Sequence, residues 1–380
     1  MKYIKRNIEK KLSEYLSLFP VVAITGPRQS GKSTLIKQTL GEEYTYVTLD
    51  DYRVIDQLND DPERFFSIHT EKVIFDEVQK YPKIFDYIKR KVDEGRDLYG
   101  RYVLTGSSQF TLQQNISESL AGRIGLLQLL PFDFLETPDE YHSIVNGSFP
   151  EQVLRNYSHN EDWYASYMET YIQKDVRMVA NIGDLHDFTR FIKLLAANVT
   201  SQFNASYYSK ILGVSVPTIK RWISVLEISY IIYLLKPYSS NLGKRIYKSP
   251  KIYFYDTGLA SFLNGAMGSK WEVGPLAGAV FENYIVSECI KNSLHKGLRI
   301  EYYYFREHNG DEIDLISEYR GEKVYLEIKH SMTFRPNMVK HLKKYMDERT
   351  LSSLIYQGES LDYSKDINVV NYKEFLRRSY

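Results

Sequence analysis

The chain has 380 residues, of which 49 are Lys or Arg and 48 are Asp or Glu, so its formal net charge is +1. This balance excludes a uniformly basic nucleic-acid-binding coat, and 43% hydrophobic with 26% charged residues excludes wholesale disorder. The single cysteine, Cys289, excludes an internal disulfide framework. The sequence also lacks a membrane-spanning apolar run and a secretory cleavage pattern. We therefore expect a cytoplasmic protein of several domains with no membrane segment.

Residues 1–135 alternate short apolar runs with amphipathic segments. Four nearly all-apolar strands are expected over Val21–Thr25, Tyr44–Leu49, Val73–Phe75 and Tyr102–Thr105. Helices are expected over Lys32–Leu40, Pro62–His69, Pro82–Glu94 and Ile116–Leu120. Apolar strands that alternate with helices predict a parallel sheet covered on both faces.

The pattern of apolar and polar residues divides the rest of the chain into three further domains. Residues 136–200 have a helical periodicity and are expected to form a helical segment. Residues 201–264 predict a winged helix, with two helices and two strands over Ser206–Leu212, Ser215–Leu226, Tyr230–Lys236 and Lys251–Tyr255. Residues 265–380 predict a small α/β domain, with helices and strands over Val280–Asn292, Ile300–Phe305, Glu312–Ser317, Lys323–Ile328 and Phe334–Asp347.

Residues 26–33 read GPRQSGKS and satisfy the P-loop pattern G-x-x-x-x-G-K-[ST] in full. In such a loop the backbone N–H groups curl round phosphates, and the start of the next helix adds its partial positive charge. Lys32 would reach the β- and γ-phosphates of ATP, and the Ser33 hydroxyl would bind Mg²⁺. The expected nucleotide-binding residues of this loop are Gly26, Pro27, Arg28, Gln29, Ser30, Gly31, Lys32, Ser33 and Thr34.

Asp76 and Glu77 end an apolar strand about 45 residues after the P-loop. Asp76 would hold the water shell of the Mg²⁺ ion, and Glu77 would polarise the attacking water. The later strand Tyr102–Thr105 ends in small polar residues and would lie beside the P-loop, where a hydroxyl could sense the γ-phosphate. Arg123 is either an arginine finger or an ordinary surface arginine.

These stretches resemble the bacterial and archaeal AAA-like ATPases, a branch of the additional-strand P-loop NTPases with a C-terminal domain of unassigned function. The resemblance runs in order through GPRQSGKST, VIFDEVQKYP, YVLTGSSQF, SLAGRIGLLQLLPFDFLE, GSFPE, YIQKDV, FENYIVSE, DEIDLI and LEIKHS. It implies that Lys32, Ser33, Asp76 and Glu77 carry ATP and Mg²⁺, that Ser107 is the sensor, and that Arg123 occupies the family's arginine position. It leaves open whether Arg123 acts on its own chain or on a second copy in a homo-oligomer.

The expected winged helix is basic, although the whole chain is nearly neutral. Between Ser201 and Lys251 eight basic residues stand against one acidic residue, which gives this region a net charge of +7. Basic residues occur on the expected second helix and on the expected wing, at Lys220, Arg221, Lys244 and Arg245. A local positive field attracts phosphates, which favours DNA as a partner. The alternative is a winged helix that packs against the ATPase part and leaves its charge solvated.

Glu282, Asp314, Glu327 and Lys329 form a further candidate site. Glu327 and Lys329 are two residues apart at the end of one expected strand and would project to the same side. Two carboxylates hold a hard cation, and a lysine can orient or deprotonate an attacking water. The ordered set resembles the PD-(D/E)XK nuclease core of archaeal Holliday-junction resolvases. Asp314 and Glu327 would be metal ligands, and Glu282 would be an outer metal ligand or bind the metal through water. Asp314, Glu327 and Lys329 would be the catalytic residues. The alternatives are a nuclease-like scaffold that no longer cuts and an unrelated fold.

The sequence therefore predicts an α/β fold: a P-loop NTPase parallel sheet, a helical segment, a winged helix and a small nuclease-like domain. The predicted function is that of a Mg²⁺-dependent AAA-like ATPase acting on or with nucleic acid, with endonuclease activity in the C-terminal domain as a further hypothesis. The alternative is an ATP-gated switch that binds DNA or a protein without cleaving it. DNA-stimulated turnover would favour the ATPase, and tight ATP binding with negligible turnover would favour the switch.

Overall fold

The computed structural model describes residues 3–106, 119–172, 185–238, 249–268, 271–347 and 350–378. The chain divides into two compact units. The first contains residues 1–132 together with the short segments 228–230 and 294–297. The second contains residues 133–227, 231–293 and 298–380. No helix in the described ranges is long and apolar enough to cross a membrane.

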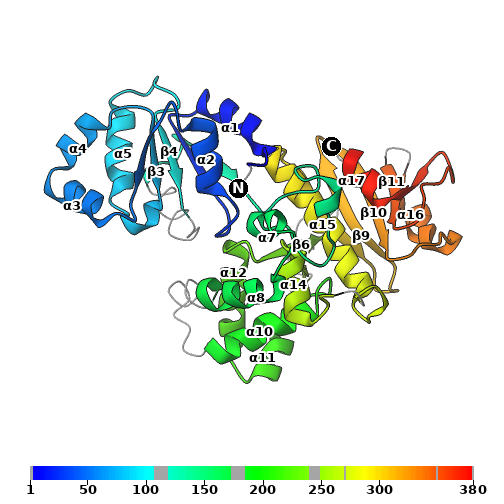
Figure 1. Ribbon diagram of the computed structural model, residues 1–380. Coiled ribbons are helices and arrows are strands. Elements are labelled where there is room, and N and C mark those ends of the chain that lie inside the picture. Colours follow the sequence, from blue (N-terminus) through cyan, green and yellow to red (C-terminus); the bar gives the residue numbers. More distant parts are fainter. Residues whose placement is uncertain are drawn as a thin grey trace. The chain divides into compact units, whose positions relative to one another are not determined.

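A five-stranded parallel sheet forms the centre of the first unit, with α5 (Ile84–Asp93) on one side and α2 (Lys32–Leu40) on the other (Figure 1). The strand order is β2-β3-β4-β1-β5, and every registered pair is parallel. The strands are β1 (Val21–Thr25), β2 (Thr45–Thr48), β3 (Val73–Asp76), β4 (Tyr102–Thr105) and β5 (Ile124–Gln128). The parallel sheet predicted from the sequence is confirmed, whereas β5 was missed because this edge strand is only half buried.

Successive side chains of each strand point to opposite faces of this sheet, so each face has its own hydrophobic core. Val22 and Ile24 of β1 pack with α1 (Ile8–Leu16) and α2, whereas Val21 and Ala23 face the opposite core. That second core is closed by α5, α3 (Tyr52–Asp60) and α4 (Pro62–Ile68), and the short 3₁₀ helix η1 (Val78–Lys80) follows β3. Because both faces are covered, the strands β1, β3 and β4 are buried along their whole length and apolar up to their last residues, which are polar.

A seven-stranded mixed sheet is the main feature of the second unit, in the order β12-β11-β10-β9-β8-β6-β7. Its strands are β6 (Ile232–Pro237), β7 (Lys251–Phe254), β8 (Glu301–Arg306), β9 (Glu312–Tyr319), β10 (Glu322–Lys329), β11 (Thr350–Tyr356) and β12 (Ile367–Asn371). The antiparallel pair β6–β7, expected as the wing, is joined to the C-terminal strands because β6 pairs in parallel with β8. The sequence did not predict this pairing, nor the strands β11 and β12.

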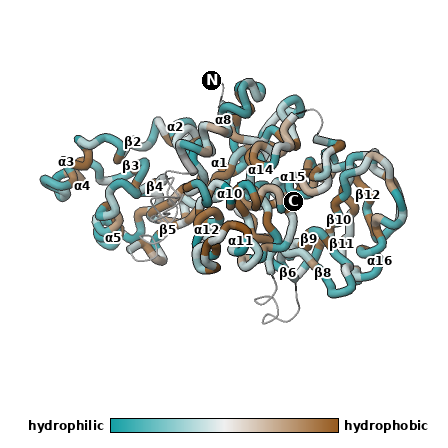
Figure 2. Tube along the Cα trace, turned by 90° about the horizontal axis from the view of Figure 1, so that it is seen from below, coloured by the Kyte–Doolittle hydropathy of each residue, from teal (hydrophilic) through white to brown (hydrophobic). Residues whose placement is uncertain are grey.

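Helices of the second unit form a bundle with its own hydrophobic core and also cover the sheet. The bundle helices are α8 (Asn160–Tyr167), α10 (Leu185–Ala197), α11 (Ala205–Leu212), α12 (Val216–Ile228) and α14 (Thr257–Asn264). Gly213, with φ +72°, ends α11 at the turn where the sequence predicted it. Trp222 is buried on α12 together with Ile219, Ile223, Val225 and Leu226, and Figure 2 shows brown stretches along this helix.

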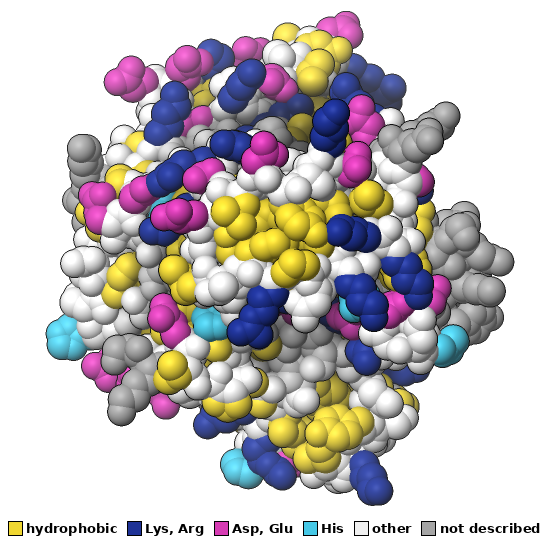
Figure 3. Space-filling model, turned by 90° about the vertical axis from the view of Figure 1, so that its right-hand side faces the viewer, with side chains coloured by type: hydrophobic (Ala, Val, Ile, Leu, Met, Phe, Trp, Pro, Cys, Tyr) yellow, Lys and Arg dark blue, Asp and Glu magenta, His cyan; other side chains and the backbone are white. Residues whose placement is uncertain are grey.

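The remaining elements of the second unit connect or flank these parts. They are η2 (Asp139–Tyr141), α7 (Pro150–Leu154), the π-helix η3 (Met168–Ile172), η4 (Trp271–Val273), α15 (Ala277–His295), η5 (Pro336–Val339), α16 (Lys340–Tyr345) and α17 (Tyr372–Arg378). Acidic and basic side chains are interspersed on the face shown in Figure 3, as the net charge of +1 leads one to expect.

Candidate functional site

The P-loop connects the end of β1 to the start of α2. Gly26 has φ +147°, and a Cβ at this position would lie 2.0 Å from the Leu129 carbonyl oxygen, so a larger residue does not fit. Gly31, with φ +95°, lies directly before α2. These two glycines let the backbone turn back over the helix N-terminus, which is the geometry that binds phosphate groups. The loop residues Arg28 and Gln29 are exposed, whereas Ser30 is buried and its Oγ has no hydrogen-bond partner among the described residues.

Lys32 is buried at the base of this loop. Its Nζ donates to the carbonyl oxygens of Gly26 and Pro27 at 2.9 and 2.8 Å. Burial lowers the pKa of Lys32 to about 8, although the neighbouring carboxylates of Glu77 and Asp76 oppose this shift. An anionic ligand would stabilise the charged amine and could replace the two carbonyls as its acceptor.

Asp76 and Ser33 are in contact, as expected of a pair that holds Mg²⁺. The Ser33 hydroxyl donates to Asp76 Oδ2 at 3.0 Å, and the backbone N–H of Glu77 donates to Asp76 Oδ1 at 3.1 Å. The hydroxyls of Tyr46 and Thr105 also donate to this carboxylate. Hydroxyl and carboxylate oxygens are the donors that a hard cation prefers, so the residues present fit Mg²⁺.

Tyr46 and Thr105 were not assigned to the site by the sequence. They come from β2 and β4, the two strands beside β3, and reach Asp76 only because the sheet places them there. Burial and the hydrogen bond to Asp76 raise the pKa of Tyr46, so this side chain remains a neutral hydrogen-bond donor. The strand ending at Thr105 was expected to supply a hydroxyl, but the residue implied by the resemblance was Ser107, which lies outside the described residues.

Glu77 follows β3 directly and has φ +57°, the left-handed region that side chains other than glycine seldom adopt. Its carboxylate accepts a hydrogen bond from the side-chain amide of Gln79. The negative charge of Glu77 raises the pKa of Lys32, against the effect of burial. The role of Glu77 as the water-activating residue stays a prediction.

Arg6 is a further residue that sequence reasoning missed. Its guanidinium is buried and donates to the carbonyls of Ser30 and Leu130 at 2.9 and 2.8 Å. These contacts tie the P-loop to the segment after β5. A lone arginine before the first helix has no local pattern that would reveal this role.

Arg123 lies at the other end of the sheet from the P-loop. It precedes β5, whose residue Ile124 pairs with Val21 at the start of β1, whereas the P-loop follows Thr25 at the end of β1. Five residues of strand span about 16 Å. The guanidinium forms a two-pronged pair with Asp93, at 2.9 Å from Nε to Oδ1 and 3.0 Å from Nη2 to Oδ2. This contact holds the pKa of Asp93 below its usual range.

The C-terminal candidates come together within the second unit. Lys329 Nζ lies 3.3 Å from Asp314 Oδ2 and 2.6 Å from Glu327 Oε1, so these two carboxylate oxygens are at most about 5.9 Å apart. The backbone N–H of Ile328 also donates to Asp314 Oδ2 at 2.8 Å. Glu327 is 3% exposed, and its Oε2 has no hydrogen-bond partner among the described residues. One cation can bridge oxygens up to roughly 5.2 Å apart, because metal–oxygen bonds are roughly 2.0–2.6 Å long, and the upper bound of about 5.9 Å leaves room for such a separation.

Glu282 joins this cluster from α15. Its Oε1 accepts from Tyr253 OH at 2.6 Å and lies 3.2 Å from Lys251 Nζ. Burial raises the pKa of both Glu282 and Glu327, and the nearby Asp314 carboxylate raises both further. Lys251, Tyr253 and Glu312, which pairs with Lys251, were not assigned to the site by the sequence.

An open pocket of about 480 Å³ lies beside the C-terminal cluster. It is lined by Glu272, Val273, Gly274, Ala277, Gly278, Glu282, Ile328, Lys329 and His330. A ligand in this pocket would contact Glu282 and Lys329, whereas Asp314 and Glu327 do not line it and contact Lys329 instead.

The predicted nucleic-acid contacts are described only in part. Lys220 and Arg221 are exposed on α12. Lys244 and Arg245 lie outside the described residues. Lys251, which contributed to the basic charge of this region, is instead buried in ion pairs.

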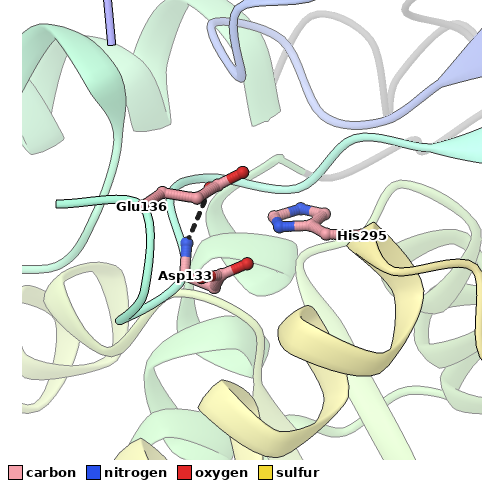
Figure 4. A group of neighbouring side chains, drawn as sticks. All are labelled: Asp133, Glu136 and His295. Carbon is pink, nitrogen blue, oxygen red and sulfur yellow. Dashed lines mark hydrogen bonds between the residues drawn. The ribbon is translucent and has the colours of Figure 1, made fainter. Parts of the chain in front are cut away.

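The segment after the first unit carries a pair of buried carboxylates, Asp133 and Glu136 (Figure 4). The backbone N–H of Asp133 donates to Glu136 Oε2 at 3.0 Å, and the backbone N–H of Leu135 donates to Asp133 Oδ1 at 2.9 Å. Both carboxylates therefore cap their own turn. His295, also labelled in Figure 4, belongs to the first unit.

Comparison with known proteins agrees with part of this picture. Residues 18–137 match a family model described as an AAA domain. Residues 138–270 and 277–375 match two domains of unknown function, DUF8612 and DUF4143. The AAA-domain match supports a P-loop ATPase family, as the sequence predicted.

The relatives of the whole chain are themselves uncharacterized. A Mycobacterium tuberculosis protein is 28% identical over 93% of this chain and 80% of its own length. A Haemophilus influenzae protein is 23% identical over 97% of both chains. Among solved structures, a Walker-type ATPase of Pyrococcus abyssi has a TM-score of 0.49 and 15% identity, over 69% of this chain and 96% of that chain.

Proposed function

We propose that the chain is a Mg²⁺-dependent ATPase whose active site lies in the first unit. The observation that supports this proposal is the meeting of Lys32, Ser33 and Asp76 at the carboxyl ends of β1 and β3. Ligands of parallel α/β sheets bind at this edge. The AAA-domain match over residues 18–137 supports the same reading.

Each residue has a defined task in this proposal. The backbone N–H groups of the P-loop hold the phosphates, and Lys32 turns from the Gly26 and Pro27 carbonyls to the β- and γ-phosphates. Ser33 and Asp76 would hold a Mg²⁺ ion, whose charge would stabilise the negative charge of the phosphates. Glu77 accepts a hydrogen bond from the attacking water and orients it toward the γ-phosphate.

The test compares two substitutions in the full chain. Lys32→Ala should abolish ATP binding, because it removes the cation that faces the phosphates. Glu77→Gln should retain ATP binding and lose turnover by at least about 10²-fold, because it keeps the shape of the side chain and removes the base. Unchanged turnover in Glu77→Gln would remove this residue from its role, and tight ATP binding with negligible wild-type turnover would favour the ATP-gated switch.

We infer that Arg123 serves the nucleotide of a second copy of the chain. Its place at the amino end of β5 supports this, because the P-loop of its own chain lies about 16 Å away along the strands. Mixing Lys32→Ala with Arg123→Ala protein should restore turnover, since one interface then combines an intact Lys32 with an intact Arg123. No recovery in the mixture would contradict the inference.

We propose a second function, metal-dependent cleavage of a phosphodiester, for the C-terminal cluster. The separation of at most about 5.9 Å between Asp314 and Glu327 oxygens supports it, as does the unpartnered Glu327 Oε2. Asp314 and Glu327 would hold Mg²⁺, whose charge stabilises the developing negative charge on the phosphate. Lys329 would orient the attacking water, and Lys220, Arg221, Lys244 and Arg245 would hold DNA through its phosphates.

A nuclease assay of the full chain with Mg²⁺ and with branched, single-stranded and duplex DNA tests this second function. We expect cleavage of at least one of these substrates. If none of them is cut while divalent cations bind at Asp314, the scaffold is a binding site that no longer cuts.

A further inference from the structure

Lys251 is a buried cation at the start of β7, and only 4% of its side chain is exposed. Its Nζ lies 3.2 Å from Glu282 Oε1 and also pairs with Glu312. Tyr253, two residues later on the same side of the strand, donates its hydroxyl to the same Glu282 oxygen at 2.6 Å. Strand β7 thus presents a cation and a hydroxyl to one carboxylate of the C-terminal cluster.

These contacts connect two parts of the chain that match two different family models. Lys251 and Tyr253 lie within residues 138–270, whereas Glu282 and Glu312 lie within residues 277–375. The sheet explains how they meet, because β7 is carried by β6, and β6 pairs with β8 beside β9. The C-terminal site is therefore incomplete without β7.

The cluster consists of two pairs of carboxylates, each bridged by one lysine. Lys329 lies between Asp314 and Glu327. Lys251 lies between Glu282 and Glu312, and Arg306 Nη1 lies 3.3 Å from the second oxygen of Glu312. The two pairs differ in what remains available. Glu327 Oε1 contacts one donor, Lys329, and its Oε2 is without a partner among the described residues, whereas Glu282 Oε1 is bonded by two donors, Lys251 and Tyr253.

We propose that Lys251 is a positioning residue of the C-terminal site, which keeps Glu282 out of direct metal coordination and leaves a divalent cation to Asp314 and Glu327. A metal–oxygen bond of roughly 2.0–2.6 Å to Glu282 Oε1 would have to displace both the lysine and the tyrosine donor. Lys251 also places a positive charge beside the cation and so lowers the affinity of the site for it. This inference rests on the metal-dependent function proposed above.

The test is Mn²⁺ binding to the full chain in the absence of nucleotide, measured by calorimetry, with Asp314→Asn to identify the C-terminal contribution. Lys251→Met removes a positive charge and frees a carboxylate, so the Asp314-dependent affinity for Mn²⁺ should rise about tenfold. Lys251→Met combined with Glu282→Gln removes the whole pair, so the affinity should stay within about threefold of the wild type.

Lys291→Met is the matched control. Lys291 is also buried, with 2% of its side chain exposed, and pairs with Glu288 on the same helix that carries Glu282. Both lysine variants should unfold at lower temperature, because each leaves a buried carboxylate without its cation. Only Lys251→Met should change Mn²⁺ affinity, a difference that a merely structural role would not produce.

Each outcome decides the inference. Unchanged or weaker Mn²⁺ binding by folded Lys251→Met overturns it. If that variant does not fold, the double variant decides, because a loss of more than about tenfold would make Glu282 a direct ligand and overturn the inference. Wild-type protein that binds no more Mn²⁺ than Asp314→Asn contradicts the metal-dependent function itself. In that case, Mn²⁺ binding that appears in Lys251→Met and depends on Asp314 supports the role of Lys251. If no such binding appears, the inference about Lys251 is overturned.

Discussion

The carboxylates of the two candidate sites are bonded by different chemical groups. In the first unit, Asp76 is surrounded by neutral donors, the hydroxyls of Ser33, Tyr46 and Thr105 and the backbone N–H of Glu77. In the second unit, carboxylates are bridged by the charged amines of Lys251 and Lys329.

The difference determines how each site can take a metal ion. The hydroxyls that bond Asp76 carry no charge, so in the proposed ATPase site they would not compete electrostatically with a cation brought by the phosphates of a nucleotide. Lysines cancel the carboxylate charge, so a cation at the C-terminal cluster must compete with them. In the proposed functions, the first site would bind its metal without a competing amine on Asp76, whereas the internal lysines of the second would lower its affinity for a metal.

The largest expected effect separates the two sites. Asp76→Asn should lower ATP turnover by about 10²- to 10³-fold, because it removes the charge that holds Mg²⁺ at the transferred phosphate. Steady-state ATPase assays across a Mg²⁺ titration measure this loss. Asp314→Asn is the matched control and should leave turnover unchanged, since Asp314 belongs to the other compact unit. Equal losses in the two variants would show that the sites do not work independently.

Asp314→Asn should lower the rate of DNA cleavage by at least about 10²-fold, because one of the two carboxylates proposed to hold the metal is lost. DNA binding, measured by fluorescence anisotropy, should remain as in the wild type. Cleavage that persists in Asp314→Asn would place any nuclease activity elsewhere.

The hydroxyls around Asp76 should have a moderate effect. Thr105→Val keeps the shape of the side chain and removes one donor, a loss of about 1 kcal/mol that corresponds to roughly a fivefold to tenfold decrease in turnover. The Mg²⁺ concentration for half-maximal rate should rise in the same variant, because Asp76 is no longer held in place. Thr189→Val, on α10, removes a hydroxyl that donates to the Leu185 carbonyl of the same helix and serves as the control. If turnover and the Mg²⁺ requirement are the same in both variants, Thr105 is not part of the site.

The smallest effect is expected for the exposed face of α12. Replacing Lys220 and Arg221 by Ala should weaken DNA binding about threefold to tenfold and flatten its salt dependence, because fewer phosphate contacts release fewer counterions. Lys10→Ala with Lys83→Ala removes two exposed charges from the first unit and should leave both quantities unchanged. If DNA affinity and its salt dependence are unchanged by the α12 substitutions, the helices α11 and α12 are purely structural.

Features that depend on neighbouring residues could be predicted from the sequence. The P-loop is eight consecutive positions, and its phosphate-binding shape follows from Gly26 and Gly31 within them. The apolar strands of the parallel sheet were recognisable because burial on both faces demands apolar residues throughout. Glu327 and Lys329 were expected to lie side by side because residues two apart on a strand share a face, and they do.

Only the tertiary structure decided which distant residues complete the two sites. Tyr46 and Thr105 lie about 30 residues from Asp76 on either side and reach it because β2, β3 and β4 are neighbours in one sheet. Lys251 contributes to a positive stretch of sequence, yet the pairing of β6 with β8 turns it from a surface charge into the partner of Glu282. The sequence of a single strand does not show which distant strand it will pair with. Local sequence therefore determined the chemistry of the P-loop, and sheet assembly determined which groups neutralise each carboxylate.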